Sequence, residues 1–362
     1  MTKKSINDLC VSIVGVGTAL PPHILPQDLV QKNAQRILGP RYPDFERLSK
    51  TFLSSGIEKR HSVRPFEWFE EPKSWPDRTK AYLEGATDLF IEASKKALAK
   101  SGLEGRDIDT IVTVSSTGIA TPTLEARAFD ELGLRQDVKR VPVFGLGCAG
   151  GVSGLSIATR LARAEPGSNV LIVAVETCTL SFRSDRMQKA DIIATALFGD
   201  GAAAVCIHAG THENALTEIG NGYEHTWPNT LPIMGWDVDV DGFGVIFDRS
   251  IPSFVTSYFR DAAEAAMARF ETKQADLTRF ICHPGGAKVV TAIEEAMNLE
   301  AETLTHEREV LKDCGNMSAP TVLFVLERVI EDRPNGNMVM TALGPGFTGS
   351  FLEMSFNGNT AQ

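Results

Sequence analysis

The sequence predicts an α/β protein built from two similar halves. Helical segments alternate with β-branched apolar segments along most of the chain. Two pairs of these segments match each other at one spacing, since Asp107 lies 169 residues before Asp276 and Cys148 lies 168 residues before Asn316. Only two copies are present, whereas a solenoid needs more copies of a shorter repeat. We therefore predict two α/β halves related by an internal pseudo-twofold axis.

The first matched pair is a helix followed by a buried strand. Residues 86–101 place small and aromatic side chains on one helical face, Gly102 can end that helix, and residues 110–118 follow as a strand. Residues 254–270 and 278–286 repeat this pattern in the second half. Each half is thus expected to contribute parallel strands to a central sheet, with helices covering it.

The second matched pair is a glycine-rich turn, a helix, a second turn and a strand. It covers residues 148–176 in the first half and residues 315–344 in the second. We place the first half at residues 1–212 and the second at residues 213–362. Sites in such folds gather at the carboxyl ends of strands.

Three segments lie outside the repeat. The N-terminal segment has charged residues followed by a short apolar stretch broken by glycine, which favours a first strand over a signal peptide. Residues 61–80 and 213–252 carry Trp, Pro and Gly in patterns typical of insertions. We expect these insertions to cover the opening of a site.

Composition limits the function classes. The 362-residue chain has a formal net charge of −10, a hydrophobic fraction of 43% and six cysteines. An acidic chain argues against nucleic-acid binding, and no apolar run approaches the roughly 20 residues of a membrane span. Six cysteines in a chain of this length are too sparse for a disulfide scaffold, so we expect reduced thiols and a cytoplasmic enzyme.

Two common cofactor motifs are absent. Gly15 and Gly17 follow a predicted strand, but the third glycine of a dinucleotide-binding turn would fall at Leu20. No two histidines or cysteines show the spacing of a metal site, so we predict no bound metal.

Cys148 is the strongest candidate for a catalytic residue. It lies in VPVFGLGCAGGVSG, where an apolar strand enters a glycine-dense turn and then a helix. Glycines permit the turn and leave the thiol uncovered, and a helix N-terminus favours thiolate over thiol. A buried core cysteine is the ordinary alternative, but it would not require this turn. Cys10, Cys206 and Cys282 lie in apolar runs and are expected in the core.

His283 and Asn316 are the candidate partners of this thiol. His283 ends a predicted strand and is followed by Pro-Gly-Gly, and Asn316 is the internal counterpart of Cys148. A core histidine and a helix N-cap asparagine are the alternatives. Two neutral donors beside a thiolate suit chemistry in which negative charge develops on a thioester oxygen, such as decarboxylation of a malonyl thioester.

At these residues the sequence resembles the type III polyketide synthases, the chalcone synthase-like branch of the thiolase superfamily. Within this family it resembles the bacterial alkylpyrone and alkylresorcinol synthases. The resemblance covers nearly the whole chain and rests on five motifs: GCAGG at 147–151, ALFGDGAAA at 196–204, HPGG at 283–286, GNMSAPTVLFVL at 315–326 and GPGFT at 344–348. It implies the five-layered αβαβα thiolase-like fold and a homodimer. It also implies acyl-CoA starters and malonyl-CoA as substrates, with no carrier protein and no further cofactor.

The resemblance also implies roles for individual residues. Cys148 would hold the starter and the growing chain as a thioester. His283 and Asn316 would bind the malonyl thioester carbonyl and stabilise the enolate, and His283 would also pair with the thiolate. Phe198 matches a gatekeeper between the CoA tunnel and the cavity, and Val245 aligns with the second gatekeeper. Further positions match the cavity lining, namely Ser116, Thr117, Cys178, Ser181, Trp236 and Ser318.

These positions predict a class of starter. Valine in place of a gatekeeper phenylalanine widens the tunnel, and small linings leave room for a long chain, whereas Trp236 fills space. We therefore expect a fatty acyl-CoA starter, extended two or three times and cyclised to an alkylpyrone or an alkylresorcinol. By the same resemblance, Thr121 would reach across the dimer interface.

The phosphates of CoA require a basic patch at the tunnel mouth. Lys50, Lys59 and Arg60 lie where the family has its CoA-contacting cluster. Two other readings remain open: a β-ketoacyl-carrier-protein synthase III-like enzyme that condenses once, and a catalytically silent acyl-CoA-binding homologue. The former family has a His-Gln-Ala-Asn turn where this chain has HPGG.

Overall fold

A computed structural model describes residues 9–42, 44–184 and 188–357 of the chain. Within these residues nine strands form one sheet, in the spatial order β11-β12-β13-β8-β1-β7-β6-β4-β5. The strands are β1 (Val11–Ala19), β4 (Thr110–Val114), β5 (Lys139–Val143), β6 (Asn169–Thr177), β7 (Asp200–Ala209), β8 (Thr217–Thr226), β11 (Leu277–Cys282), β12 (Gly336–Gly344) and β13 (Thr348–Phe356). Two antiparallel strand pairs lie outside this sheet, β2 (His23–Pro26) with β3 (Lys59–Ser62) and β9 (Met234–Asp239) with β10 (Gly242–Phe247).

The strand pairing shows the duplication. In the first half β1, β7 and β6 pair antiparallel in turn, and β6 pairs parallel with β4. In the second half β8, β13 and β12 pair antiparallel in turn, and β12 pairs parallel with β11. The halves meet where β1 and β8 pair antiparallel, Ser12 opposite Glu218 and Ile13 opposite Thr217. The predicted duplication is confirmed, and the boundary after residue 212 stays a prediction.

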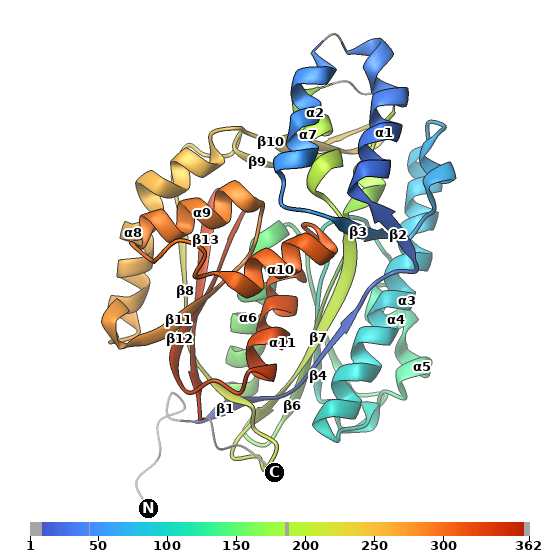
Figure 1. Ribbon diagram of the computed structural model, residues 1–362. Helices are drawn as coiled ribbons and strands as arrows, with labels where there is room; N and C mark the ends of the chain where they lie inside the picture. Colours follow the sequence, from blue (N-terminus) through green and yellow to red (C-terminus); the bar gives the residue numbers. More distant parts are fainter. Residues whose placement is uncertain (1–8, 43, 185–187, 358–362) are drawn as a thin grey trace, which may run out of the picture.

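The helices complete five layers (Figure 1). Helices α6 and α11 lie between the two halves of the sheet, where Val152 and Leu155 of α6 share a buried core with Val322 and Val325 of α11. Helix α3 covers the outer face of the first half, and α8 and α9 cover the outer face of the second. The bounds are α1 (Gln27–Leu38), α2 (Phe45–Ser54), α3 (Trp75–Ser101), α4 (Leu124–Arg127), α5 (Phe129–Leu132), α6 (Gly150–Ala164), α7 (Lys189–Leu197), α8 (Ile251–Arg269), α9 (Ala287–Ala296), α10 (Thr305–Cys314) and α11 (Thr321–Glu331). This is the predicted αβαβα arrangement.

The two predicted insertions are partly wrong. Helix α3 begins at Trp75, because Ser74 and Asp77 form a capping box. The Ser74 side chain accepts a hydrogen bond from the Asp77 backbone N–H, and the Asp77 side chain accepts one from the Ser74 backbone N–H. Residues 75–80 therefore belong to the long outer helix. Strand β8 joins the main sheet between β1 and β13, so only the β9–β10 pair remains as an addition in that region.

A cap of three helices lies at one end of the molecule. Helices α1, α2 and α7 pack on one another, with Val30 and Ala34 of α1, Phe52 of α2 and Ile192 of α7 in a common buried cluster. Figure 1 shows this cap beside the β9–β10 pair. Among the described helices, we find none that combines the length and the apolar character of a membrane span.

Candidate active site

Cys148 lies in a turn that only glycine-rich sequence can form. Gly145 and Gly147 have φ values of +91° and +49°, in the left-handed region that favours glycine. A Cβ at Gly147 would lie 2.7 Å from Cδ of Pro345, so the space is also closed. The turn continues into a short 3₁₀ helix (Gly147–Ala149) and then into α6. Cys148 is thereby held at the start of the central helix, as predicted.

The thiol is buried, with consequences for its ionisation. Burial raises the pKa of Cys148 to about 11; side-chain contacts with Ser318 and Asn316 lower it, and the nearby Glu176 charge raises it. The helix N-terminus was expected to favour the thiolate, but loss of solvation has the larger effect on the pKa of Cys148.

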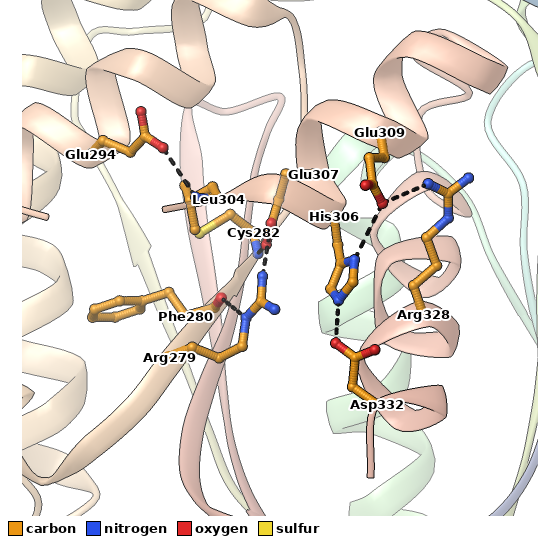
Figure 2. A network of polar contacts seen from close by, with 10 residues as sticks. All are labelled: Arg279, Phe280, Cys282, Glu294, Leu304, His306, Glu307, Glu309, Arg328 and Asp332. Atoms are coloured by element: carbon orange, nitrogen blue, oxygen red, sulfur yellow. Dashed lines mark hydrogen bonds and ion pairs between the residues drawn. The ribbon is translucent and has the colours of Figure 1, made fainter. Parts of the chain in front are cut away.

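His283 directly follows β11, and a buried carboxylate fixes the end of that strand. Glu307 accepts hydrogen bonds from the backbone N–H of Cys282, at 2.9 Å, and from Nη2 of Arg279, at 3.0 Å (Figure 2). The backbone N–H of His283 itself donates to the carbonyl of Thr341 at 2.9 Å. The histidine is thus held by its main chain on both sides.

The imidazole of His283 is only 4% exposed. Burial lowers its pKa to about 3, so the ring is neutral near pH 7. Neither ring nitrogen has a hydrogen-bond partner among the described residues, so the implied pairing with a Cys148 thiolate is not formed here. Both nitrogens remain available to a ligand.

Asn316 precedes α11 and is fixed by backbone pairing. It forms a parallel β-bridge with Phe198: the Asn316 N–H donates to the carbonyl of Leu197 at 2.8 Å, and the Gly199 N–H donates to the carbonyl of Asn316 at 3.0 Å. Its side-chain Nδ2 donates to the carbonyl of Gly285 at 3.1 Å.

The remaining contacts of Asn316 point it at the thiol. Its Oδ1 accepts from the backbone N–H of Ser318 at 2.8 Å and lies 4.0 Å from Sγ of Cys148. Nδ2 therefore keeps one N–H for a ligand. The amide is a neutral donor in a fixed orientation beside the sulfur.

The structure brings the three predicted catalytic residues together. Cys148, His283 and Asn316 line one cavity of about 330 Å3, together with Phe247 and other apolar residues. A buried thiol, a neutral imidazole and an amide in one cavity suit a thioester whose oxygen acquires negative charge. Their catalytic roles stay predictions.

Four of the predicted lining residues meet in a second, larger cavity of about 730 Å3. Cys178, Ser181, Phe198 and Val245 line it, between the helical cap and the turn after β6. Thr117 and Trp236 line a smaller neighbouring space, which Ser181 also lines.

The other two predicted lining residues, Ser116 and Ser318, line none of these three cavities and lie beside the segments that hold the site. Ser116 accepts a hydrogen bond from Nε1 of Trp236 on its carbonyl, at 2.8 Å, and one from the Gly145 N–H on its hydroxyl, at 3.0 Å. Ser318 has φ +61°, an unusual backbone conformation for serine, directly after the bridge that holds Asn316.

Sequence reasoning missed Phe247 and Glu176. The ring of Phe247 packs edge to face on Phe198, with centroids 6.4 Å apart, and lines the small cavity. Phe198 therefore lies between the two cavities. Its ring packs against the rings of Phe247 and Trp236, whereas the predicted second gatekeeper was Val245. The FGVIF alternation offered the only signal, since Val245 and Phe247 share one face of β10.

Glu176 is a fully buried carboxylate at the end of β6. It accepts hydrogen bonds from the backbone N–H of Ser116, at 2.9 Å, and from Oγ1 of Thr117, at 2.7 Å. Burial raises its pKa to about 8 in spite of these bonds. The native state therefore retains a proton that the unfolded chain releases above the ordinary carboxyl pKa.

This proton makes stability depend on pH. Between about pH 5 and 8 the Glu176 carboxyl binds more proton in the native state than in the unfolded state, so its contribution to the free energy of unfolding should fall as pH rises, by up to about 1.4 kcal/mol per pH unit. Glu176→Gln should remove this slope, and the surface variant Glu92→Gln should keep it. Urea unfolding at pH 5.5 and 8 measures the difference, and equal slopes in wild type and Glu176→Gln would contradict the assignment.

The predicted CoA cluster divides into two parts. Lys50 and Lys59 are exposed and remain available to phosphates. Arg60 is only 2% exposed and donates to main-chain carbonyls inside the protein. The prediction that Arg60 belongs to an exposed basic patch is wrong, because its side chain turns inward from β3.

Other predictions concern the surface and the core. Thr121 is exposed, near exposed Ile119 and Phe144, and its place in a dimer interface stays a prediction. Cys206 and Cys282 are buried as expected, whereas Cys10 is only partly buried. Within the described residues, no cluster of His, Cys, Asp and Glu has the arrangement of a metal site.

Comparisons with known proteins cover both halves. Residues 2–211 match the family model for the N-terminal domain of chalcone and stilbene synthases, and residues 220–353 match the model for the C-terminal domain. The 1,3,6,8-tetrahydroxynaphthalene synthase of Streptomyces peucetius subsp. caesius is 36% identical over 357 residues, which is 97% of this chain and 94% of that protein.

Two further matches extend over nearly whole chains. A putative chalcone synthase of Bacillus subtilis (strain 168) is 31% identical over 361 residues, 95% of this chain and 98% of that protein. The crystal structure of the C-terminal type III polyketide synthase domain of Steely1 from Dictyostelium superposes with a TM-score of 0.89 at 26% identity, covering 96% of this chain and 99% of that domain.

Proposed function

The chain belongs to the chalcone and stilbene synthase family and is a type III polyketide synthase, and from this premise we propose that it extends a fatty acyl starter with malonyl-CoA. The family assignment makes it a condensing acyltransferase. The proposal adds the residues that carry each step, the class of starter and the class of product. The cavity arrangement around Phe198 is the observation that supports it.

Cys148 carries the acyl group. Its sulfur attacks the starter thioester carbonyl, the bond to CoA breaks, and CoA leaves as a thiol. Malonyl-CoA then binds with its thioester oxygen toward His283 and Asn316. Loss of CO2 leaves its electron pair as an enolate, whose carbon attacks the Cys148 thioester. The carbon–sulfur bond breaks, Cys148 leaves as a thiolate, and the extended chain remains on CoA as a β-ketoacyl thioester. The two neutral donors stabilise the enolate oxygen during this step.

The large cavity supports a fatty acyl starter. It lies beside Phe198, and its lining is mostly apolar, as is typical of sites that bind apolar ligands. Apolar side chains form much of its lining. They come from α1, from β2 and from the segment after β3, and include Leu25, Val30, Ala34, Ile37, Phe66 and Phe69. Phe198 borders this cavity and contacts Phe247 of the catalytic cavity. An alkyl tail can lie under α1 while its thioester remains at Cys148.

The small side chains at the inner end suit the growing chain. Cys178, Ser181 and Val245 line the cavity close to Phe198. Two or three extensions followed by cyclisation would give an alkylpyrone or an alkylresorcinol. The reaction needs no cofactor beyond CoA thioesters and no carrier protein. Lys50 and Lys59 would contact CoA phosphates, and a homodimer formed through the Thr121 region in the cytoplasm completes the proposal.

A malonyl starter is the second candidate. The 36% identical relative is named a 1,3,6,8-tetrahydroxynaphthalene synthase, and the product in that name carries no alkyl chain, so it needs no fatty acyl starter. A malonyl starter would use only the inner part of the large cavity. Two other readings are tested in the same way: a single condensation needs malonyl-carrier protein as donor, and a silent homologue would form no product with any donor.

A starter panel distinguishes these candidates. The protein is incubated with acyl-CoA thioesters from acetyl to palmitoyl and an aromatic acyl-CoA, with malonyl-CoA or malonyl-carrier protein, and adducts and products are read by mass spectrometry. We expect an acyl adduct on Cys148 and preference for medium to long chains with malonyl-CoA. Preference for acetyl-sized or aromatic starters, or product from malonyl-CoA alone, would contradict the fatty acyl assignment.

The cavity also predicts a shift in chain length. Ala34 is 3% exposed and lines the cavity, so Ala34→Phe should fill its outer end and move the preferred starter to shorter chains, with about a tenfold loss of kcat/KM for the longest. Leu29→Phe adds volume on the exposed face of the same helix and should leave the preference unchanged. An equal profile in both variants would place the tail elsewhere.

A further inference from the structure

Arg60 has an unusual position for a cation. Its guanidinium is buried, and Nη1 donates to the carbonyl of Thr195 at 2.5 Å and to the carbonyl of Phe198 at 3.1 Å. Nη2 donates to Oε1 of Gln27 at 2.5 Å. One side chain therefore ties β3 to the end of α7, to Phe198 and to the start of α1.

The tie extends from Phe198 to Asn316. The segment Leu197–Gly199 holds the backbone of Asn316 through the β-bridge and its two hydrogen bonds. The stem of Arg60 packs behind this bridge: a Cβ at Gly199 would lie 3.1 Å from Cβ of Arg60, and a Cβ at Gly315 would lie 3.3 Å from it. The guanidinium and its stem thus support both chains of the bridge.

A buried cation is costly, so its retention calls for an explanation. Among the described residues, no carboxylate forms an ion pair with Arg60, and its Nε has no hydrogen-bond partner. Asp200 acts only at longer range, and burial lowers the pKa of Arg60 to about 9. An apolar side chain could fill the same volume without this cost, but it could not hold three acceptors at once.

We infer that Arg60 is a positioning residue that fixes the Phe198 gate and, through the bridge, the amide of Asn316. It sets both the width of the passage between the two cavities and the direction of the amide donor. The inference rests on the proposed function of Phe198 and Asn316. It replaces the role of a CoA-phosphate contact.

The Gln27 side chain is the second half of the same tie. Its Nε2 donates to the carbonyls of Phe52, at 3.2 Å, and Ala196, at 2.9 Å, while its Oε1 accepts from Arg60. Gln27 thereby joins the two cap helices to the segment that carries Phe198. A change at Gln27 should loosen the same elements without leaving a cavity as large as that left by Arg60.

Two substrates separate positioning from phosphate binding. Decarboxylation of malonyl-CoA is measured beside that of malonyl-N-acetylcysteamine, which has no phosphates. In Arg60→Met we expect kcat to fall about 10- to 100-fold with both substrates and KM for malonyl-CoA to change less than about threefold. A rise in KM confined to malonyl-CoA, with kcat unchanged, would overturn the inference in favour of a phosphate contact.

Further variants keep the test decisive if Arg60→Met does not fold. Gln27→Met should lower kcat in the same pattern by a smaller factor, and Arg60→Lys should recover only part of the loss, because lysine cannot present a fork of donors. The double variant Gln27→Met/Arg60→Met should lose no more than Arg60→Met, since both act through one tie. Fully additive losses would overturn the shared tie.

Arg64→Met is the matched control. Arg64 follows β3 and pairs with Glu84 at the surface, so its removal should leave both substrates unaffected. Failure of the proposed function looks different from failure of this inference. If Asn316→Ala decarboxylates normally, the role proposed for Asn316 fails, whereas normal kcat in Arg60→Met and Gln27→Met alone removes only the positioning role.

Discussion

Cys148→Ala is expected to abolish polyketide formation, by a factor of at least about 10⁴, while malonyl-CoA is still decarboxylated within about tenfold of the wild-type rate. The reason is that the two half-reactions use different atoms of the cavity. In the proposed mechanism the sulfur accepts the acyl group, whereas His283 and Asn316 face the enolate oxygen. Removing the sulfur leaves the Asn316 amide held by Gly285 and Ser318.

The measurement follows both half-reactions in one sample. Intact-protein mass spectrometry with a fatty acyl-CoA reports the adduct, and release of CO2 from malonyl-CoA reports decarboxylation. Cys206→Ala removes another buried thiol, in the core of the first half, and should keep the adduct. An adduct that persists in Cys148→Ala would show that a different group carries the chain.

The catalytic cavity could be predicted because the duplication places its residues. Cys148 and Asn316 occupy equivalent positions in two halves that repeat one strand order, so both had to approach the internal axis. His283 follows the strand of the second half that matches β4. A strand terminus and a register offset are properties of the sequence pattern itself.

Arg60 shows what the pattern could not predict. Neighbouring lysines are exposed, and an arginine after a lysine is usually solvated. Whether a side chain in a short strand turns inward depends on which face meets α7, and that contact joins segments more than a hundred residues apart. Phe247 was missed for a similar reason, because the pairing of β9 with β10 decides which side chain meets Phe198.

Burial also explains why ionisation was predicted less well than position. A helix N-terminus favours a thiolate by roughly a kcal/mol or less at exposed sites. Complete removal from water acts more strongly and in the opposite direction, raising the pKa of Cys148 and lowering the pKa of His283. The depth of a site is a property of the assembled layers, and no local motif reports it.

Asn316→Ala should produce the reverse of the Cys148 result. The variant should still form the acyl adduct, since the sulfur and its turn are unchanged, but decarboxylation of malonyl-CoA should fall about 10²- to 10³-fold, the loss typical of one oxyanion donor. Alanine keeps the backbone bridge to Phe198, so the change is confined to the amide.

The comparison isolates the donor from the fold. Asn337→Ala removes an exposed asparagine from the same half and should leave both half-reactions intact. If Asn316→Ala loses adduct formation as well, the amide also supports acyl transfer, and the division of labour between the sulfur and the amide is wrong. If decarboxylation is unchanged, His283 alone stabilises the enolate.

Because Nδ2 of Asn316 is already held by the carbonyl of Gly285, with one N–H left over, the amide loses little freedom when the oxyanion forms. A donor that is fixed in advance gains the most from charge that appears only in the transition state, and the loss in Asn316→Ala should therefore lie in kcat rather than in KM.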